Sequence, residues 1–350
     1  MKKLLKALVI FISSLVIGFL IFLLAATLGN YNPDEQIVIQ ESESYDLLPD
    51  WTEYDFIIWN IGYCGLDASM DFFYDGGEQV RPAEEKVNIS LDKITELLSG
   101  NDTVEFFLLQ EVDINSKRSY HENEYKRIEE TLASYNSAEG INYKVFFVPI
   151  PPTEPMGKVK SGLQTLSKFI PKETIRHSFP GNYSWPMGVF MLDRCFLVSR
   201  FTVNNGKDLL IVNTHNSAYD DGSLREAQMD YLKVFLLEEY KKGNYVIVGG
   251  DWNQSPAGFI KEFDDQVFDN ENYTEIPEGY PEGDWQWAFD EQTPTNRRVK
   301  TRYERGVTPT TLVDFYLMSP NIQLISVKTK DMNFQHSDHQ PVFLRMSLKN

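Results

Sequence analysis

Apolar positions cluster in short runs along most of the chain, and amphipathic stretches separate them. Continuous apolar runs at residues 55–60, 104–112 and 245–251 predict buried strands. Residues 83–98 and 224–242 repeat their apolar positions at the helical spacing and predict two amphipathic helices. Further strands are expected at residues 144–150, 208–215, 311–319 and 341–348. Many short β-rich runs with few helices favour a layered α/β fold with mixed strand directions.

The first apolar run is much longer than the others. Residues 7–28 carry no charged side chain, and as a helix they would extend about 33 Å, enough for a hydrocarbon core of roughly 30 Å. Three lysines precede this run and acidic residues follow it, so the positive-inside rule leaves residues 1–6 in the cytoplasm and exports the remainder. We predict a transmembrane signal-anchor helix. A cleaved signal peptide is the alternative, although its apolar part is usually only about 7 to 15 residues long.

Residues 29–52 follow the apolar run and contain two prolines, many acidic residues and no sustained periodicity. This composition predicts an acidic tether between the membrane and the folded part of the chain. No similar stretch interrupts residues 53–350. We therefore expect these residues to form a single domain.

The composition excludes several classes of protein. With 42% hydrophobic and 24% charged residues, the chain is neither disordered nor collagen-like. Its two cysteines, Cys64 and Cys195, could form one bridge at most, which excludes a disulfide scaffold. The 51 acidic residues outnumber the 33 Lys and Arg residues and give a net charge of −18. Such a surface repels polyanions, so non-specific binding of duplex DNA is disfavoured.

Polar side chains of the kind that bind metals or phosphates stand where four predicted strands end. These residues are Asn60, Glu111, His215 and Asp251, and Asn253 follows two positions after the last of them. A lone asparagine at a strand end usually belongs to a turn. Because strand ends at one edge of a sheet converge, the whole set is instead expected to form a site.

Asp314 begins a predicted apolar strand, and a buried carboxylate is costly without a partner. His339 is the natural candidate for that partner. The other histidines are expected at the surface or in loops: His121, His177 and His336. The tryptophans beside the polar strand ends, Trp59 and Trp252, are expected to pack in the core rather than to stack on a substrate.

Six short motifs together resemble the endonuclease/exonuclease/phosphatase superfamily, which includes deoxyribonuclease I and the neutral sphingomyelinases. They occur in the family's order: WN at 59–60, LLQEVD at 108–113, VNTH at 212–215, GGDWN at 249–253, VDFYLMS at 313–319 and SDHQPV at 337–342. Each motif alone is weak, whereas six in order are specific. The resemblance implies a deoxyribonuclease I-like four-layer α/β sandwich, with two packed mixed β-sheets between outer helices, after the N-terminal transmembrane helix.

The resemblance also implies metal-dependent hydrolysis of phosphate esters. Glu111 and Asn60 match metal ligands of the family, and Asp338 is expected to be a further ligand or an orienting acid. Their hard oxygen atoms suit Mg²⁺, with Mn²⁺ as the alternative ion. Hydrolysis further requires a base that prepares water and a proton source for the leaving oxygen.

The remaining matched residues supply these catalytic groups. Asp251 is expected to orient or deprotonate the attacking water, and Asn253 to hydrogen-bond the phosphate oxygens. His339, held by Asp314, would act as general base or stabilise the phosphoryl charge. His215 matches the histidine that hydrogen-bonds phosphate or protonates the leaving group.

The motifs fix the reaction but leave the substrate open. Basic residues are concentrated at 297–305 in an otherwise acidic chain, and we expect Arg297 and Arg298 to bind substrate phosphate through bidentate contacts. A solvated basic loop is the alternative. Arg118 is a further candidate for phosphate binding. The aromatic loop at 280–289 is expected to pack under the chain rather than to touch lipid.

These observations predict a membrane-anchored phosphoesterase whose catalytic domain, residues 53–350, lies in the periplasm or outside the cell. A lipid headgroup or a small phosphorylated metabolite is the favoured substrate. An extracytoplasmic nuclease that cleaves DNA or RNA is an alternative, since local loops can supply basic contacts. A non-catalytic binding protein with the same fold is the alternative from another class. It is disfavoured because every residue of the catalytic set is retained.

Overall fold

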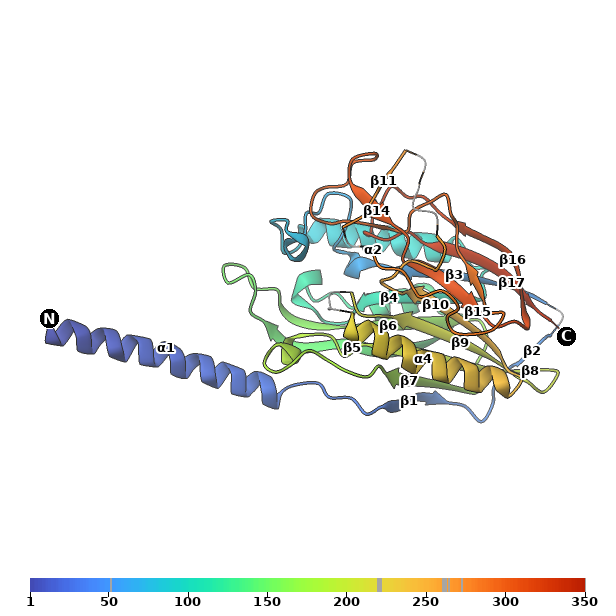
Figure 1. Ribbon diagram of the computed structural model, residues 1–350, viewed down its shortest axis with the longest axis horizontal. Helices are drawn as coiled ribbons and strands as arrows, with labels where there is room; N and C mark the ends of the chain where they lie inside the picture. Colours follow the sequence, from blue (N-terminus) through green and yellow to red (C-terminus); the bar gives the residue numbers. More distant parts are fainter. Residues whose placement is uncertain (51, 219–221, 260–262, 264, 272, 350) are drawn as a thin grey trace.

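The structure is a computed structural model that describes residues 1–50, 52–218, 222–259, 263, 265–271 and 273–349 (Figure 1). Its larger sheet has the strand order β1-β7-β8-β9-β10-β15-β12, and β2 pairs with β8. The strands of this sheet are β1 Gln36–Glu41, β2 Leu47–Leu48, β7 Glu173–Ser178, β8 Cys195–Val203, β9 Asp208–His215, β10 Tyr245–Asp251, β12 Gln286–Ala288 and β15 Asp314–Met318.

The second sheet has six strands in the order β16-β17-β3-β4-β6-β5. They are β3 Glu53–Asn60, β4 Phe106–Asp113, β5 Asn136–Val148, β6 Gly157–Ser167, β16 Ile322–Thr329 and β17 Val342–Leu348. Three short strands form a separate small sheet: β11 Val267–Phe268, β13 Asn296–Arg297 and β14 Pro309–Thr311. The helices are α1 Lys2–Leu28, α2 Glu84–Ser99, α3 Glu124–Thr131 and α4 Ser223–Lys241, and the 3₁₀ turns include η4 Met187–Phe190.

Side-chain alternation along the strands explains the layers. Phe56 and Ile58 of β3 point into the core between the two sheets, whereas Ile57 and Trp59 point toward α2 and α3. The larger sheet likewise buries its outer face against α4, through residues such as Leu232. The order is therefore α4, sheet, sheet, then α2 and α3. This is the predicted deoxyribonuclease I-like four-layer sandwich with two mixed sheets.

Helix α1 projects away from this sandwich (Figure 1). Among the described residues it is the one helix long and apolar enough to cross a membrane, with a mean hydropathy of 3.0. Most of its side chains are exposed, and Leu23 and Ala26 near its end are buried against the domain. The predicted apolar helix is present, and its last turns contact the folded part of the chain.

Two expectations about the N-terminal half require correction. Residues 29–52 were expected to be a tether, but β1 pairs with β7 and β2 with β8 at the edge of the larger sheet. His177 was expected at the surface or in a loop, but it lies in β7, 5% exposed, with its ring stacked on Phe196 at 4.8 Å between centroids. Cys64 and Cys195 are free, and each is buried in a different apolar cluster.

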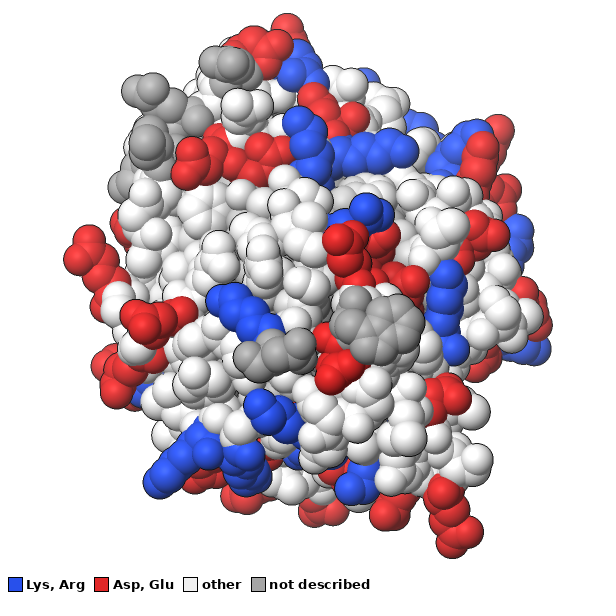
Figure 2. Space-filling model, turned by 90° about the vertical axis from the view of Figure 1, so that its right-hand side faces the viewer, with Lys and Arg blue, Asp and Glu red and all other residues white. Residues whose placement is uncertain are grey.

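The face of the molecule opposite α1 carries charged side chains of both signs (Figure 2). Figure 2 shows it with Lys, Arg, Asp and Glu side chains interspersed, so that neither sign dominates. Mixed surface charge of this kind is typical of a face that contacts water. The tryptophans of the loop at 280–289 do not add to an apolar surface, because Trp285 is buried and Trp287 packs on the core below α4, as expected.

Candidate active site

Strand pairing brings the polar strand ends together. Strands β9 and β10 are parallel, and their register places His215 opposite Asp251. Strand β15 is antiparallel to β10 and places Asp314 opposite Asp251 from the other side. In the second sheet, β3 and β4 are parallel, so Asn60 and Glu111 reach the same edge. The two sheets therefore contribute to one cluster of polar side chains.

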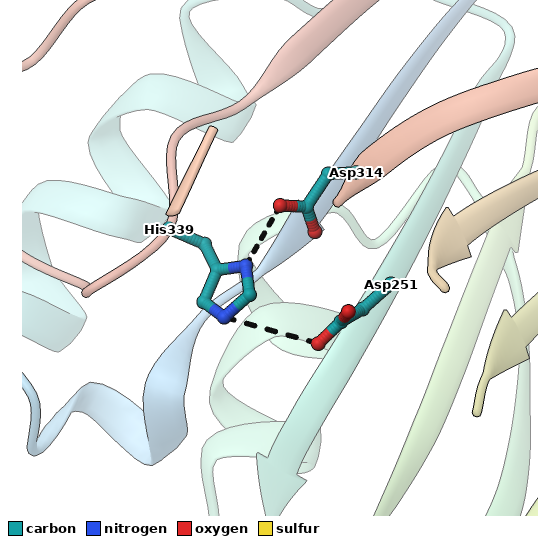
Figure 3. A group of neighbouring side chains, drawn as sticks. All are labelled: Asp251, Asp314 and His339. Atoms are coloured by element: carbon teal, nitrogen blue, oxygen red, sulfur yellow. Dashed lines mark hydrogen bonds and ion pairs between the residues drawn. The ribbon is translucent and has the colours of Figure 1, made fainter. Parts of the chain in front are cut away.

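Asp251, Asp314 and His339 form the buried centre of this cluster (Figure 3). His339 Nδ1 lies 2.7 Å from Asp314 Oδ2, and His339 Nε2 lies 3.8 Å from Asp251 Oδ2. One ligand atom from each residue lies within 4.8 Å of the others, so the group could hold a metal ion. Asp314 is thus the imidazole partner that its position in the sequence required.

Asn60 and Glu111 contact the same centre from the second sheet. Asn60 Nδ2 donates to Asp251 Oδ2 over 3.0 Å and lies 3.5 Å from Glu111 Oε1. His215 Nε2 lies 3.4 Å from Asp251 Oδ2 and 4.0 Å from Glu111 Oε1. His339 therefore lies beside Asp251, and Glu111 is linked to Asp251 through Asn60 and His215. In the sequence, 228 positions separate Glu111 from His339.

The backbone is strained at two of these positions. Glu111 has a φ of 55°, and the pairing of β4 with β6 shifts register between Leu109 and Val112. Such a bulge re-aims a side chain, and a positive φ at a non-glycine residue costs of order 1–3 kcal/mol. Asn253 has a φ of 51°, and its N–H donates to Asp251 Oδ1 over 2.9 Å. Strain of this kind clusters at functional sites.

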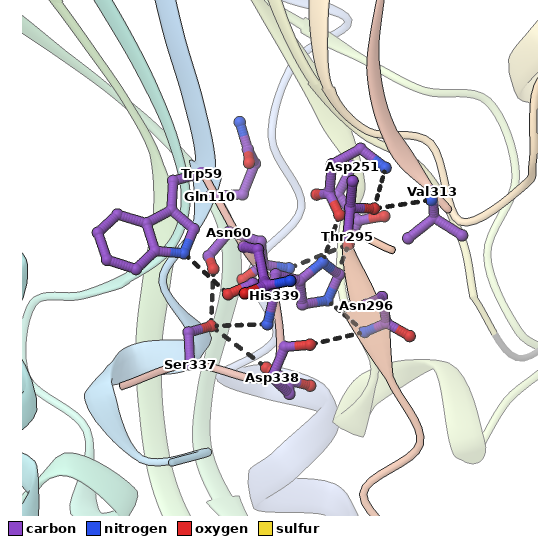
Figure 4. Close-up of polar contacts among 12 residues, drawn as sticks. Trp59, Asn60, Gln110, Asp251, Thr295, Asn296, Val313, Ser337, Asp338 and His339 are labelled. Carbon is purple, nitrogen blue, oxygen red and sulfur yellow. Dashed lines mark hydrogen bonds and ion pairs between the residues drawn. The ribbon is translucent and has the colours of Figure 1, made fainter. Parts of the chain in front are cut away.

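A hydrogen-bonded segment fixes Asp338 and His339 (Figure 4). Trp59 Nε1 donates to the carbonyl oxygen of His339 over 3.0 Å. Ser337 Oγ donates to the carbonyl oxygen of Asn60 over 2.8 Å and accepts from the N–H of His339 over 3.1 Å. Trp59 is 1% exposed and Trp252 is fully buried, so both are packing residues, as expected.

The cluster opens into a cavity of about 480 Å³. All but two of the residues expected from the sequence line it: Glu111, Arg118, His215, Asp251, Asn253, Arg297, Arg298, Asp338 and His339. Asn60 and Asp314 lie behind this surface, 1% and 0% exposed. They act on the site through the hydrogen bonds described above.

Arg118 lines the cavity with its charge already paired. Its Nη2 lies 2.9 Å from Asp113 Oδ1, and its guanidinium stacks 3.7 Å above the ring of Tyr63. An arginine held in this way is pre-oriented, and it lends positive potential to the carboxylates around Glu111. It can approach phosphate only through the part of its guanidinium that Asp113 does not use.

The structure disfavours a phosphate clamp by the other two predicted arginines. Arg298 Nε donates to Asp269 Oδ2 over 2.8 Å, and Glu271 contacts the same guanidinium. Arg297 is 1% exposed, and its guanidinium donates to main-chain carbonyls of Leu66, Asp67, Met70, Arg298 and Thr301. Arg297 therefore holds the loop after β3 in place, and Arg298 is neutralised by acids.

Two polar residues beside the catalytic cluster, among those that the structure describes, were not found from the sequence. Arg194 precedes β8 and approaches Glu111 and Asp251, and its Nη1 is buried without a hydrogen-bond partner in the described part of the chain. Asn296 Nδ2 lies 2.9 Å from His339 Nε2. A charged residue directly before an apolar strand was the signal that identified Asp314, and the same signal would have identified Arg194. Asn296 carries no comparable signal.

The two imidazoles have opposite electrostatic environments. Burial lowers the pKa of His339, but the surrounding carboxylates, Asp314 foremost, raise it well above the usual value. Burial lowers the pKa of His215 well below its usual value, and nearby arginines add to this effect. Burial also raises the pKa of Asp338 to about 7. The surrounding carboxylates therefore favour the protonated form of His339, whereas burial favours the neutral form of His215.

The donor set fits a hard divalent cation. Glu111, Asp251 and Asp338 present carboxylate oxygens at one end of the cavity. Asp314 Oδ1 is buried with no hydrogen-bond partner among the described residues. Carboxylate oxygens in excess of fixed cations are the ligands that Mg²⁺ and Mn²⁺ take.

Asn60 is oriented away from a ligand role. Its Oδ1 accepts from the N–H of Gly62 over 3.0 Å, so the NH₂ group faces Asp251 and Glu111. The two ends of an amide are assigned from the hydrogen-bond network. A cation beside Glu111 would favour a half-turn of the amide, because the oxygen would then face the positive charge.

Comparisons with known proteins identify the family. The model of the endonuclease/exonuclease/phosphatase family matches residues 57–305, a stretch that contains the strand ends from Asn60 to Asn253. No curated protein matches the chain significantly.

Solved structures match over most of the chain at low sequence identity. The 2',3'-cyclic phosphatase ANGEL2, in complex with adenosine-2',3'-vanadate, has a TM-score of 0.56 at 14% identity, covering 88% of this chain and 99% of ANGEL2. An endonuclease/exonuclease/phosphatase protein of Bacteroides vulgatus has a TM-score of 0.51 at 14% identity, covering 85% and 100%. One of Beutenbergia cavernae has a TM-score of 0.50 at 16% identity, covering 85% and 72%. At these identities the matches establish the fold alone.

Proposed function

The chain belongs to the endonuclease/exonuclease/phosphatase family, and from this premise we propose that it is a divalent-cation-dependent phosphoesterase anchored in a membrane by α1. The observation that carries the proposal is the meeting of Glu111, Asp251 and His339 in one cavity, with Asp314 behind the imidazole. Hydrolysis of a phosphate ester needs oxygen ligands for a cation, a base and an acid. These residues supply all three groups.

Glu111 and Asp338, with Asn60 after rotation of its amide, would hold Mg²⁺ or Mn²⁺. The bound cation would neutralise charge on the phosphoryl oxygens. Of the side chains expected from the sequence, Arg118 is best placed to help neutralise this phosphoryl charge, because it adds a positive charge beside Glu111. Arg194 places a second guanidinium near the same carboxylate.

The catalytic groups follow from the distances in the cluster. Asp251 lies between the two imidazoles, 3.4 Å from His215 Nε2 and 3.8 Å from His339 Nε2. In the proposed reaction Asp251 takes a proton from the attacking water, while His215 orients the carboxylate. His339, held by Asp314, gives a proton to the leaving oxygen. Asn253 hydrogen-bonds a phosphoryl oxygen from the loop after β10.

A lipid headgroup or a small phosphorylated metabolite is the favoured substrate. The chain has a net charge of −18, and the basic stretch at 297–305 is largely paired internally. A nuclease needs basic surface along the path of the nucleic-acid backbone. The bases of this stretch that were expected to supply it are instead neutralised or buried.

A substrate panel tests the proposal. The full chain, purified in detergent with Mg²⁺, would be assayed on bis-p-nitrophenyl phosphate, sphingomyelin, phosphatidylinositol phosphates, adenosine 2',3'-cyclic phosphate and DNA. We expect hydrolysis of bis-p-nitrophenyl phosphate and of a lipid or small phosphate ester, with Glu111→Gln as the inactive control. Hydrolysis of DNA and of no other substrate would show that the protein is a nuclease and not an esterase of lipids or small metabolites. A wild-type chain inactive on the whole panel would refute the enzyme.

The membrane topology has its own test. A protease added outside intact cells should degrade residues 53–350, provided that any outer envelope is permeabilised, and should leave α1 in the membrane. A soluble chain that lacks residues 1–28 would instead establish a cleaved signal peptide.

A further inference from the structure

The membrane-facing end of the domain can be located from α1, if this helix spans a bilayer as proposed above. Phe22 of α1 stacks on Phe190 with ring centroids 5.7 Å apart and planes 9° apart. It also contacts Phe146 and Phe147 of β5, with centroids at 6.0 and 6.1 Å. The helix is therefore seated on the domain before it ends at Leu28.

The helix rise sets the depth of this contact. Twenty apolar residues, at about 1.5 Å each, are needed for a hydrocarbon core of roughly 30 Å. Counted from Ala7, the first residue after Lys6, that length reaches Ala26. Phe22 then lies about 6 Å inside the outer edge of the core. The aromatic residues that contact Phe22 must lie near the level where acyl chains meet headgroups.

Large apolar side chains are exposed on the segments that hold the helix. Phe146 is 45% exposed and Ile150 40% exposed in and after β5, and Trp185 and Met187 are 65% and 56% exposed beside η4. We call these four residues the apolar rim. Trp185 Nε1 also donates to Thr27 Oγ1 over 3.1 Å, which places it beside the end of α1. Exposed tryptophan beside a membrane helix is typical of the bilayer interface.

The catalytic cavity opens beside this rim. Its wall includes Tyr183 and Arg194, which flank the rim residues of η4, and Met156, which follows the hairpin turn after Ile150. In Figure 1, β17 runs toward the C-terminus on the side away from α1. His339, just before β17, is therefore at the end of the sheets that faces α1. The opposite face carries interspersed charges (Figure 2).

From this geometry we propose that the apolar rim inserts into the outer interface of the bilayer spanned by α1, so that the cavity acts on phosphate esters held at that membrane surface. A headgroup would enter from the bilayer side while its acyl chains remain in the membrane. A soluble phosphodiester reaches the same cavity without using the rim. The two kinds of substrate should therefore respond differently to changes in the rim.

Fluorescence quenching tests the insertion. The full chain would be reconstituted in phosphatidylcholine vesicles with and without brominated acyl chains, which quench only tryptophans that reach them. Trp185 is far more exposed than Trp59, Trp252 and Trp285. We expect brominated lipid to quench the wild-type emission and to quench the Trp185→Phe variant clearly less. Equal quenching of both proteins, or no quenching of either, would overturn the insertion.

Hydrolysis rates test the consequence for the substrate. Trp185→Ser combined with Met187→Ser should lower hydrolysis of vesicle-borne sphingomyelin or phosphatidylinositol phosphate about 5- to 10-fold, because the buried apolar area is lost. Hydrolysis of bis-p-nitrophenyl phosphate should stay unchanged. The matched control is Leu47→Ser, which removes a side chain 61% exposed in β2, on the side away from α1, and should change neither rate.

The outcomes separate this inference from the proposed function. Wild-type protein inactive on bis-p-nitrophenyl phosphate would refute the phosphoesterase itself. Wild-type protein active on that substrate but on neither vesicle-borne lipid would refute the membrane-surface substrate alone. Equal losses on lipid and soluble substrates in the rim variant would show that the rim acts on the fold, and would also refute the inference.

Discussion

The two ends of β9 hold their charged side chains in opposite ways. At its start, Asp208 belongs to a cluster in which Arg200 pairs with Glu173, Asp208 and Glu239 at 2.8 to 3.1 Å. Lys242 adds a second cation, 2.7 Å from Glu239. At the other end of the same strand, His215 belongs to the catalytic cluster. There the carboxylates lie mainly beside imidazoles, an amide and one another. Among the described residues, few of their neighbours are lysine or arginine.

The comparison separates stability from function. Each carboxylate of the partly buried Arg200 cluster has a cationic partner, which removes most of the cost of taking it out of water. In the catalytic cluster Asp314 Oδ1, His215 Nδ1 and the hydroxyl of Tyr63 are buried without hydrogen-bond partners in the described structure. A buried polar group left unpaired costs about 1–3 kcal/mol. The unpaired groups therefore lower the stability of the catalytic end of β9. A bound cation and a phosphate group would supply the missing partners.

Removal of a catalytic side chain should give the largest effect. We expect Glu111→Ala and His339→Ala each to lower kcat on bis-p-nitrophenyl phosphate by about 10²- to 10⁴-fold, the usual share of one acid–base or electrostatic group. Both variants should stay folded. Glu111→Ala should change the melting temperature little, whereas His339→Ala should lower it, because it leaves the buried Asp314 carboxylate without its partner. Near-wild-type turnover of either variant would disprove its assigned role.

Removal of the Asp314 charge beside His339 should give the second largest effect. Asp314→Asn keeps the size of the side chain but removes the charge that orients His339. We expect a kcat loss of roughly 10- to 100-fold or more. The activity profile should also shift to lower pH, because the carboxylates raise the pKa of His339 and one of them is gone. An unchanged pH profile would show that Asp314 only fills space.

Addition of the cation should stabilise the catalytic end of β9 and so reduce its difference from the Arg200 cluster. Binding to the folded state alone stabilises by about 2.7 kcal/mol at a hundred times Kd, which corresponds to a rise in melting temperature of roughly 3–6 °C. Mg²⁺ or Mn²⁺ should produce this rise in wild-type protein and much less of it in Glu111→Gln. Equal rises in both proteins would place the cation elsewhere.

The Arg200 cluster should respond in stability and not in activity. Burial raises the pKa of Glu239, but hydrogen bonds from Arg200, Lys242 and Asn244 bring it down to about 2. This stabilisation is present above the unfolded pKa of about 4.3 and is lost as pH falls toward 2. We expect Glu239→Gln to lose about 1–2 kcal/mol at pH 7, with wild-type kcat, and the difference in unfolding free energy to shrink below pH 4.

The site residues that stand at the ends of strands could be predicted from the sequence. Asn60, Glu111, His215 and Asp251 were found because parallel strands deliver their carboxyl ends to one edge. Asp314 was found because a buried carboxylate needs a partner. The helices and the layered fold followed from the same periodicities, since both faces of each sheet are covered.

The remainder depended on tertiary contacts that periodicity does not contain. Strand β1 is a short edge strand with mixed burial, and its pairing with β7 decides its structure. Arg297 belongs to a basic stretch, but it is caged by carbonyl oxygens of a loop more than 220 positions away. His177 is buried by an aromatic stack that no local pattern announces.

In the proposed function, the strand-end cluster hydrolyses phosphate esters with the help of a bound dication. The most direct test is hydrolysis of bis-p-nitrophenyl phosphate after removal of divalent cations with EDTA, followed by titration with Mg²⁺ or Mn²⁺, for wild-type protein and Glu111→Gln. We predict that wild-type activity is lost and then restored with saturation, whereas the variant stays at baseline throughout. Activity that survives EDTA, or a variant that titrates like wild type, would contradict the claim.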